Sequence, residues 1–356
     1  MMQEDSLAPL SEKALYDPSE LDDAEGVHLL VSLPALNEEM TIDSVIRAIP
    51  RAIPGVRQVD VLVIDDGSTD GTSRLAREAG AKVIRHSAPR GVGFAFHRAL
   101  AHAIEIGADL VVSIDADGQF DALDIPKLVR PVLQGEADFV TASRFKDPKL
   151  VPVMPRAKLW GNRMMSRLVS KLTGERFFDV SCGMRCYSRK ALLQLHLLGR
   201  FTYTQEVFLN LAFKNLRIVE VPVSVKGERS FGESRVASNL FRYAWQTSQI
   251  IFRCYRDYHP LRFFGSMALA LLLPAMGLGG FLVFHYFQTG GFSPYKWTGF
   301  ASAALLLVAM LIAHVAVIGD MLNRHRVYLE EVLYRQRRQP QDGEHRRISA
   351  RASGQQ

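Results

Sequence analysis

The chain has 356 residues, 48% of them hydrophobic and 22% charged, and its formal net charge is +6 at pH 7. This length allows about two domains. The basic residues lie mainly in the second half, where no nucleic-acid-binding motif occurs, so an anionic lipid or phosphate substrate is the expected partner and not a nucleic acid. Cys182, Cys186 and Cys254 lack the spacing of a zinc site and are expected to be reduced thiols in the cytosol.

Residues 1–26 are predicted to form an acidic, flexible tail. Between Met1 and Glu25 the acidic side chains face one lysine, Lys13, and large apolar residues are few, which is typical of a segment without a packed core. The segment lacks the basic start and apolar stretch of a signal peptide. The domain that follows is therefore expected to stay in the cytosol.

Residues 27–237 are predicted to form one α/β domain, because short apolar runs alternate with segments of helical spacing. Such alternation favours a mostly parallel sheet covered by helices on both faces. The apolar runs begin at 28, 59, 81 and 108, and the helical segments are 40–53, 73–80 and 93–107.

Polar residues follow three of the predicted strands, at Asn37-Glu38-Glu39, Asp65-Asp66-Gly67-Ser68 and Asp115-Ala116-Asp117. Residues two apart in a strand point the same way, so the carboxylates of Asp115 and Asp117 would repel without a cation. Mg²⁺ is usually held by one or two carboxylates plus substrate phosphates. A solvated turn is the alternative, since Asp and Gly are common in turns. Ligands of parallel sheets bind beyond the carboxyl ends of the strands, so the convergence of these ends favours a metal site.

Other motif interpretations fail on spacing. A calcium loop that begins at Asp66 needs Glu at its twelfth position, where Arg77 stands, and one that begins at Asp115 lacks Gly at its sixth. The glycine-rich stretch at Gly91 has Phe96 where a dinucleotide fingerprint needs Gly or Ala. The chain contains neither GxxxxGK[ST] nor GxSxG.

Two segments mix large apolar residues with arginines. Val151–Gly174 is predicted to be a loop and helix that meet the bilayer surface, with a basic solvated helix as the alternative. Residues 238–262 are predicted to form an amphipathic juxtamembrane helix in the headgroup plane, with an ordinary surface helix as the alternative.

Two transmembrane helices are predicted, at 263–287 and 297–318, because both runs lack charged residues and are long enough to cross a bilayer. Arginines precede the first run and follow the second, and the connector carries one lysine. The positive-inside rule then places both termini in the cytoplasm, with 321–356 as a basic cytoplasmic tail. The expected location is the cell (inner) membrane, as a multi-pass protein.

The motifs LPALNEE, VLVIDDGSTDGT and SIDADGQF, followed by DVSCGMRCYSR and GERSFGESR, resemble the family 2 glycosyltransferases of GT-A fold. Among these the chain is similar to the polyprenyl-phosphate (dolichyl-phosphate) sugar synthases, over about Val27 to Arg262 and the paired spans. The resemblance implies a GT-A, Rossmann-like catalytic domain and an inverting transfer. The sugar would pass from a nucleotide-diphosphate sugar, of GDP-mannose or UDP-hexose type, to dolichyl or undecaprenyl phosphate. Related enzymes can assemble through their spans, which allows a homo-oligomer.

The resemblance also implies the residues of the site. Pro34, Glu38, Asp65 and Asp66 would line the nucleotide pocket, one of the aspartates accepting from a base N–H. The residues expected to bind Mg²⁺ or Mn²⁺ and the diphosphate are Asp115, Asp117 and Gln119, with Ala116 between them. The catalytic set is Asp117, Arg144, Glu206, Arg229 and Arg235.

Charge explains why arginines are expected. A phosphate monoester has a second pKa near 6 and is largely ionised at neutral pH, so an attacking lipid phosphate needs little general-base help. Two anions must instead be brought together, and Arg binds phosphate bidentately. Arg163, by its place on a predicted helix, and Ser234, as a donor to a phosphate oxygen, complete the phosphate-binding candidates.

Two alternatives stay open. The first is transfer to a sugar hydroxyl of a lipid-linked glycan, which needs a carboxylate base, with Glu206 or Asp179 as candidates; for Glu206, an acid at a helix N-terminus is the plain interpretation. The second is a non-catalytic membrane scaffold. A processive polysaccharide synthase is not favoured, because QxxRW is absent from the chain.

Overall fold

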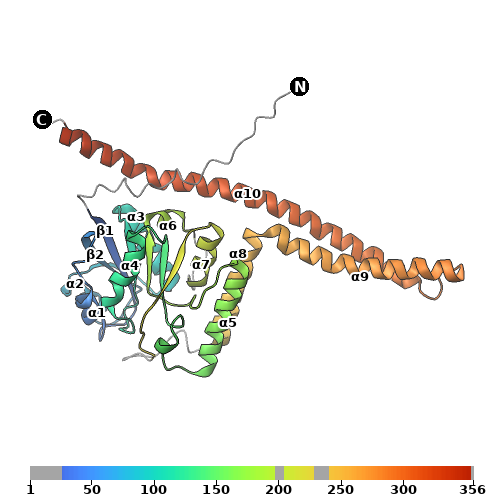
Figure 1. Cartoon of the computed structure of the whole chain (residues 1–356), viewed down its shortest axis with the longest axis horizontal. Helices are drawn as coiled ribbons and strands as arrows, with labels where there is room; N and C mark the ends of the chain where they lie inside the picture. The colour runs from blue at the N-terminus through green and yellow to red at the C-terminus, as the bar shows by residue number, and fades with distance from the viewer. Residues whose placement is uncertain (1–25, 197–203, 228–239, 354–356) are drawn as a thin grey trace.

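The computed structural model describes residues 26–196, 204–227 and 240–353. A seven-stranded sheet, in the order β3-β2-β1-β4-β6-β5-β7, forms the centre of the α/β domain. Helices cover both faces of the sheet, and two long helices extend away from it (Figure 1).

The sheet is mostly parallel, as predicted. Its strands are β1 (Val27–Ala35), β2 (Val56–Asp65), β3 (Lys82–Arg85), β4 (Leu110–Ser113), β5 (Phe139–Ser143), β6 (Arg185–Ser188) and β7 (Ile218–Pro222). β6 is antiparallel to both β4 and β5, while the other neighbours pair in parallel. Periodicity in the sequence does not reveal strand direction, so this reversal was not predicted.

Each face of the sheet has its own hydrophobic core. The helices of the domain are α1 (Ile42–Ala48), α2 (Thr72–Glu78), α3 (Val92–Glu105), α4 (Ile125–Leu133), α5 (Arg156–Thr173), α6 (Arg189–Gln194) and α7 (Thr204–Phe213). Residues of α1, α2 and α4 join one core, and residues of α3, α5, α6 and α7 join the other. Val111 and Val112 of β4 enter opposite cores, which is why this strand is a continuous apolar run.

The helix predicted over 40–53 is shorter in the structure and ends at Ala48. Ile49 has extended backbone angles, φ −67° and ψ 120°, and is followed by Pro50. The ring of a proline disfavours the helical conformation of the residue before it, so the helix stops there.

The C-terminal part consists of α8 (Leu240–Tyr258), α9 (Pro260–Thr289) and α10 (Lys296–Ser353). α9 and α10 each contain a stretch long and apolar enough to cross a membrane, and only 11% and 17% of these stretches are buried. The two helices pack closely, because Ser302 donates to the carbonyl of Ala275 at 2.7 Å and faces Gly279, where no side chain intervenes. α10 does not end with its apolar run but continues as a helix past the α/β domain (Figure 1).

Candidate active site

The predicted polar strand ends meet at one edge of the sheet. β1 lies between β2 and β4, and all three run in parallel, so their carboxyl ends are neighbours. The chain fills the sheet outward from β1 to β3 and then returns to add β4 on the other side of β1. The order of strands therefore reverses between β1 and β4, which is the position where open α/β sheets bind their ligands.

Side-chain hydrogen bonds join the loops that follow β1 and β2. Ser68 Oγ accepts from the backbone N–H of Asn37 at 2.9 Å, and Asn37 Oδ1 accepts from the N–H of Thr69 at 2.8 Å. Thr72 Oγ1 accepts from the N–H of Glu38 at 2.9 Å. Asn37 has a φ of 54°, a conformation that Asn tolerates better than most residues. These hydrogen bonds thus hold the two loops together at this edge of the sheet, the position at which we expect the ligand crevice.

Asp65 is fully buried at the same edge of the sheet. Its carboxylate accepts from the N–H of Ser68 at 2.7 Å and from the hydroxyl of Ser73, and it lies 3.6 Å from Arg85 Nε. Burial acts to raise the pKa of Asp65, but the hydrogen bonds of Ser68 and Ser73 and the charge of Arg85 lower it below its usual value. The residue stays ionised and holds the turn in place.

Asp66 organises the loop that leads into α3. It contacts His86 Nδ1 at 2.8 Å and accepts from the backbone N–H groups of Arg90 and Gly91 at 2.9 and 2.8 Å. Pro34 and Glu38, the other residues predicted for the nucleotide pocket, are half-buried at the end of β1. The four residues share one edge of the sheet, while their contact with a nucleotide remains a prediction.

The acidic segment after β4 is anchored from two sides. Thr41 Oγ1 donates to the carbonyl of Ala116 at 2.8 Å, which ties this segment to the loop after β1. Asp117 is 3% exposed and accepts from the N–H of Gln119 at 3.0 Å. The amide of Gln119 donates through Nε2 to the carbonyl of Lys226 at 3.0 Å, so its Oε1 points away from Lys226.

A glycine packs directly against Asp115. A Cβ atom built on Gly183 would overlap with the carboxylate of Asp115, so only glycine lets the backbone approach this closely. The donor set of Asp115, Asp117 and Gln119 consists of oxygen atoms, which suits Mg²⁺ or Mn²⁺. Within the described parts of the chain, no cluster of three or more His, Cys, Asp or Glu side chains could hold a metal ion. A cation here would need further ligands from a bound diphosphate.

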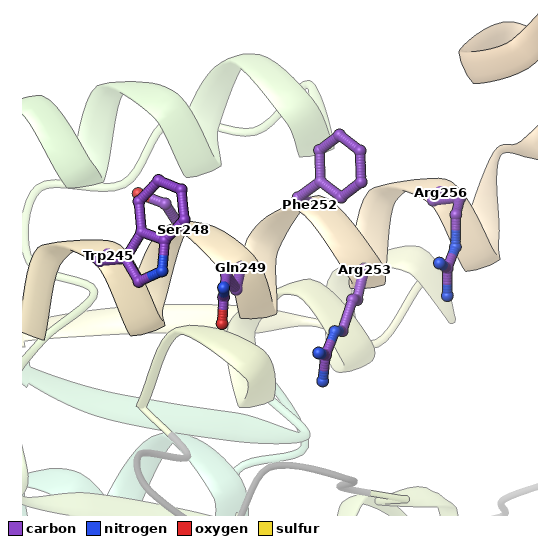
Figure 2. Close-up of a pocket in the computed structure, with 6 residues that line it drawn as sticks. All are labelled: Trp245, Ser248, Gln249, Phe252, Arg253 and Arg256. Carbon is purple, nitrogen blue, oxygen red and sulfur yellow. The ribbon is translucent and has the colours of Figure 1, made fainter. Parts of the chain in front are cut away.

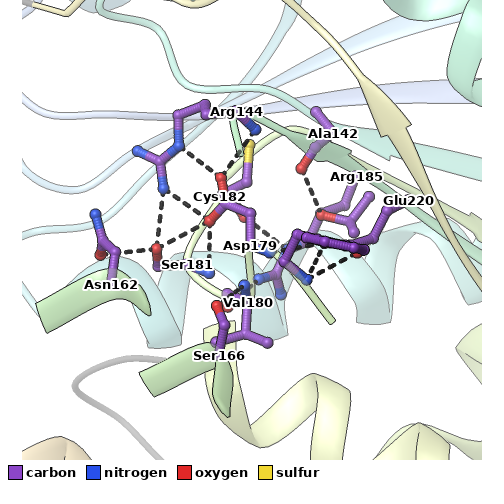
Figure 3. A network of polar contacts seen from close by, with 12 residues as sticks. Ala142, Arg144, Asn162, Ser166, Asp179, Val180, Ser181, Cys182, Arg185 and Glu220 are labelled. Carbon is purple, nitrogen blue, oxygen red and sulfur yellow. Dashed lines mark hydrogen bonds and ion pairs between the residues drawn. The ribbon is translucent and has the colours of Figure 1, made fainter. Parts of the chain in front are cut away.

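Arg144 lies beside this acidic segment, in the polar network that Figure 3 shows. Its Nε and Nη2 donate to the carboxylate of Asp179 at 2.7 and 2.9 Å, and Nη2 also donates to Ser181 Oγ at 2.9 Å. Burial acts to lower the pKa of Arg144, but Asp179, Cys182 and Asp115 raise it above its usual value. The guanidinium is therefore charged and already paired.

Asp179 is fully buried, and its pKa is set by opposing effects. Burial acts to raise it, while the charge and hydrogen bonds of Arg144 lower it below the usual value. Its backbone N–H donates to Glu220 at 2.7 Å, which ties the network to β7 (Figure 3). Sequence reasoning considered Asp179 only as a base and did not predict Ser181, Gly183 or Glu220; the motif DVSCGMRCYSR was the available signal.

The remaining predicted residues are more scattered. Arg163 is exposed on α5, and Glu206 is buried in the first turn of α7. Arg229, Ser234 and Arg235 lie outside the described residues. The structure thus brings Arg144 together with Asp115, while the places of the other predicted cations in the crevice remain predictions.

α5 and α8 carry large apolar side chains on their outer surfaces, which we call the α5–α8 face. Both helices pack against α7 and lie close together in Figures 1 and 2. Trp160 and Trp245 are 63% and 61% exposed. Other exposed residues of this face are Met164, Leu168 and Phe252, with the basic Arg163 and Arg253. An open groove of about 400 Å³ runs along α8, lined by Trp245, Ser248, Gln249, Phe252, Arg253 and Arg256 (Figure 2).

Comparisons with known proteins agree with this geometry. The glycosyl transferase family 2 model matches residues 31–195. A UDP-N-acetylglucosamine–dolichyl-phosphate N-acetylglucosaminyltransferase of Methanococcus voltae is 33% identical over 211 residues, covering 54% of this chain and 82% of that protein. A dolichyl-phosphate hexose transferase of Haloferax volcanii is 32% identical over 208 residues, covering 58% of this chain and 86% of that protein.

A solved structure has the same fold. It is glucosyl-3-phosphoglycerate synthase of Mycobacterium tuberculosis in complex with Mn²⁺, UDP and glucosyl-3-phosphoglycerate, with a TM-score of 0.52 and 27% identity, covering 67% of this chain and 84% of that one. The acidic strand ends at the point where the strand order reverses, together with these similarities, lead to one conclusion: the chain belongs to glycosyl transferase family 2 and is a hexosyltransferase with a GT-A-type catalytic domain.

Proposed function

We propose that this enzyme is anchored in a membrane and transfers a sugar from a nucleotide-diphosphate sugar to the phosphate of a polyprenyl lipid. The observation that carries the proposal is that one chain combines the acidic switch-point crevice with the α5–α8 face and an apolar helix pair. The crevice suits a diphosphate, and the apolar surfaces suit a lipid. The relatives named as dolichyl-phosphate transferases support the same acceptor class.

The donor would lie across the carboxyl ends of β1, β2 and β4. Asp115, Asp117 and Gln119 would hold Mg²⁺ or Mn²⁺, which supplies positive charge to the diphosphate. The mycobacterial structure, which contains Mn²⁺ and UDP, supports this placement. Asp66 and Glu38 would then face the nucleoside.

The acceptor phosphate would attack from the opposite face of the sugar. A phosphate oxygen forms a bond to C1 while the bond from C1 to the diphosphate oxygen breaks, so the nucleoside diphosphate leaves and the anomeric configuration inverts. The attacking oxygen is already ionised and needs no base. Arg144, beside Asp115, and Arg163 are the described cations proposed to attract the acceptor, joined by Arg229, Ser234 and Arg235.

The state of the two candidate bases favours a phosphate acceptor over a sugar hydroxyl. A hydroxyl nucleophile needs a carboxylate that can take its proton. Asp179 is fully buried and paired with Arg144, and Glu206 is buried under the helices that cover α7. Neither is placed as a general base for an incoming lipid-linked glycan.

The membrane arrangement is proposed from the apolar helices. Their outer surfaces are almost entirely exposed, and contiguous apolar surface of that extent needs lipid or a partner to cover it. The positive-inside rule places the catalytic domain and both termini in the cytoplasm. The α5–α8 face would then rest at the headgroups, with Trp160 and Trp245 as interfacial anchors.

A donor panel tests the proposal. Purified full-length protein is incubated with Mn²⁺ or Mg²⁺, a short polyprenyl phosphate and one of several UDP- or GDP-sugars, and lipid-linked sugar is quantified. We expect one donor to give a metal-dependent, β-linked product that is lost with EDTA. Transfer to a lipid-linked glycan but not to the polyprenyl phosphate would overturn the proposed acceptor.

A further inference from the structure

The part of α10 beyond its apolar run contacts the catalytic domain through a cluster of polar side chains. This cluster, which we call the α10 clamp, consists of Lys214, Tyr258, Arg326, Glu330 and Arg337. They come from α10, from the end of α8 and from the residue after α7. The clamp lies apart from the crevice at the carboxyl ends of β1, β2 and β4.

An ion pair forms the centre of the clamp. Lys214 Nζ lies 3.1 Å from Glu330 Oε2, and the two side chains are 12% and 19% exposed. Burial acts to lower the pKa of Lys214, and the charge of Glu330 opposes that effect. Lys214 Nζ also donates to the carbonyl of Gln194 in α6, and Glu330 Oε1 lies 4.0 Å from Arg326 Nε. Placing a like charge at either position would bury two repelling groups together, which is strongly destabilising to this contact.

Two further contacts extend the clamp along α10. The guanidinium of Arg326 lies 3.6 Å from the centre of the Tyr258 ring, in a cation–π arrangement. The hydroxyl of Tyr258 accepts from Asn210 Nδ2 of α7 at 2.8 Å. Arg337 Nη1 donates to the carbonyl of Leu193 in α6 at 3.1 Å. α10 is therefore attached to α6, α7 and α8.

The clamp adds a second connection between the helix pair and the catalytic domain. The first is covalent, where His259 alone joins α8 to α9. A single joint allows the domain to rotate, whereas two separated attachments fix its orientation. α10 is one uninterrupted helix, and Glu330 lies about 18 Å along its axis from the end of the apolar run at Ile318. The tilt of the apolar part of α10 therefore determines the orientation of the catalytic domain (Figure 1).

We propose that the α10 clamp positions the catalytic domain over the bilayer, at the height and tilt that bring the crevice to a lipid phosphate. The depth of a headgroup phosphate is set by the membrane, so the enzyme must place its crevice to match. Lys214 and Glu330 are positioning residues and touch no substrate. The expected effect of the clamp on the transfer rate rests on the proposed function, whereas its effect on the orientation of the domain does not.

Charge reversal in the full-length protein tests the proposal. Lys214→Glu and Glu330→Lys each break the pair, and the double variant again places opposite charges at the two positions. Because Lys214 also donates to the carbonyl of Gln194 and Glu330 lies 4.0 Å from Arg326, the recovery expected in the double variant is partial. Glu331→Lys is the matched control, since this neighbouring residue is exposed and forms an ion pair with Arg335 of its own helix. All proteins are reconstituted in vesicles with a Trp297→Phe background, which leaves Trp160 and Trp245 of the α5–α8 face as the tryptophans.

The first readout is quenching of tryptophan fluorescence by lipids brominated near the headgroup, which requires no enzymatic activity. We expect at least twofold less quenching in each single variant, with partial recovery in the double variant and no change in Glu331→Lys. Undiminished quenching in the single variants, or no quenching in the parent protein, would overturn the positioning role.

The second readout is the rate of transfer to two acceptors, a long-chain polyprenyl phosphate in vesicles and a short, water-soluble one. We expect the transfer rate of the single variants to fall about tenfold with the vesicle acceptor and less than twofold with the soluble one. A folding defect would instead lower both rates equally. Equal losses on both would contradict positioning. If no donor supports transfer in the parent protein, the proposed function fails, while the quenching result still decides the clamp.

Discussion

In the crevice at the strand ends, the acidic side chains are buried and hydrogen-bonded within the chain, whereas the tryptophans of the α5–α8 face are exposed. The carboxylates of Asp65, Asp66 and Asp117 each accept backbone hydrogen bonds that hold a loop in place. The side chains of Trp160 and Trp245, by contrast, lie mostly outside the packed protein. Under the proposed function, the protein itself would preorganise the donor half of the site, formed by the strand ends, and the membrane would complete the acceptor half, formed by the α5–α8 face. Substitutions in the first half should therefore act in any assay, and those in the second only when a bilayer is present.

The largest effect is expected from Asp117→Ala, which removes one of the two carboxylates proposed to hold the metal. Metal ions stabilise several kcal/mol of transition-state charge, so transfer should fall about 1,000-fold with either soluble or vesicle-bound acceptor. Asp121→Ala, in the same segment but exposed, is the control and should retain at least half of the rate. Full activity of Asp117→Ala at low Mn²⁺ would refute the metal assignment.

A large loss of stability is expected from Asp179→Asn, because it leaves the charge of Arg144 buried without its partner. Breaking a buried ion pair costs about 3–5 kcal/mol, which lowers the melting temperature by about 10 °C for a domain of this size. The exposed pair of Asp43 and Arg47 supplies the control, and Asp43→Asn should change little.

The same variant has a predictable pH dependence. The pKa of Asp179 is lower in the folded state than the value of about 3.9 in an unfolded chain. Its stabilising contribution is therefore complete above that ordinary value and is lost as the pH falls through the lowered one. The gap in melting temperature between the parent protein and Asp179→Asn should be widest above pH 5 and narrow below pH 4. A gap that widens in acid would contradict the lowered pKa.

The sequence predicted where the parallel strands end better than it predicted the side-chain contacts around those ends, for a physical reason. A buried parallel strand is an uninterrupted apolar run, so the point where polar residues begin, as at Asp65 and Asp115, marks its carboxyl end. The pairing of Arg144 with Asp179 depends on the reversed strand β6 and could not be derived from spacing. Gly183 is required because its backbone lies against the carboxylate of Asp115, and this tertiary contact cannot be seen in a single sequence.

The C-terminal helices show the same limit. Hydropathy correctly predicted two long apolar helices, since the absence of charge over a membrane-length run is a local property; that these helices span a membrane stays a prediction. It did not predict that α10 would continue as a helix, because a change from apolar to basic composition does not end a helix. Contacts such as Lys214 with Glu330 join residues far apart in the chain and depend on the tertiary structure.

A smaller effect within the donor half is expected from Gly183→Ala. The new methyl group would meet the carboxylate of Asp115, which must move away. Displacing residues that orient a metal ligand typically costs 10- to 100-fold in metal affinity, and we expect about tenfold. The measurement is Mn²⁺ binding by electron paramagnetic resonance in the presence of UDP or GDP. Gly161→Ala, at a helical glycine with open space around it, should bind Mn²⁺ normally.

The smallest effect is expected from Trp160→Ala on the α5–α8 face. The side chain is 63% exposed, so its loss should leave the melting temperature and the rate with a soluble acceptor unchanged. Burial of a large apolar side chain yields about 1.5–3 kcal/mol, and a ring that is only partly immersed should contribute about 1 kcal/mol, or roughly fivefold in KM for the vesicle acceptor. Leu123→Ala is the control, since Leu123 is equally exposed but lies on the sheet face covered by α1 and α4. If Trp160→Ala weakened the enzyme equally with both acceptors, the face would be part of the protein's own site and the division between a preorganised half and a membrane-completed half would be wrong.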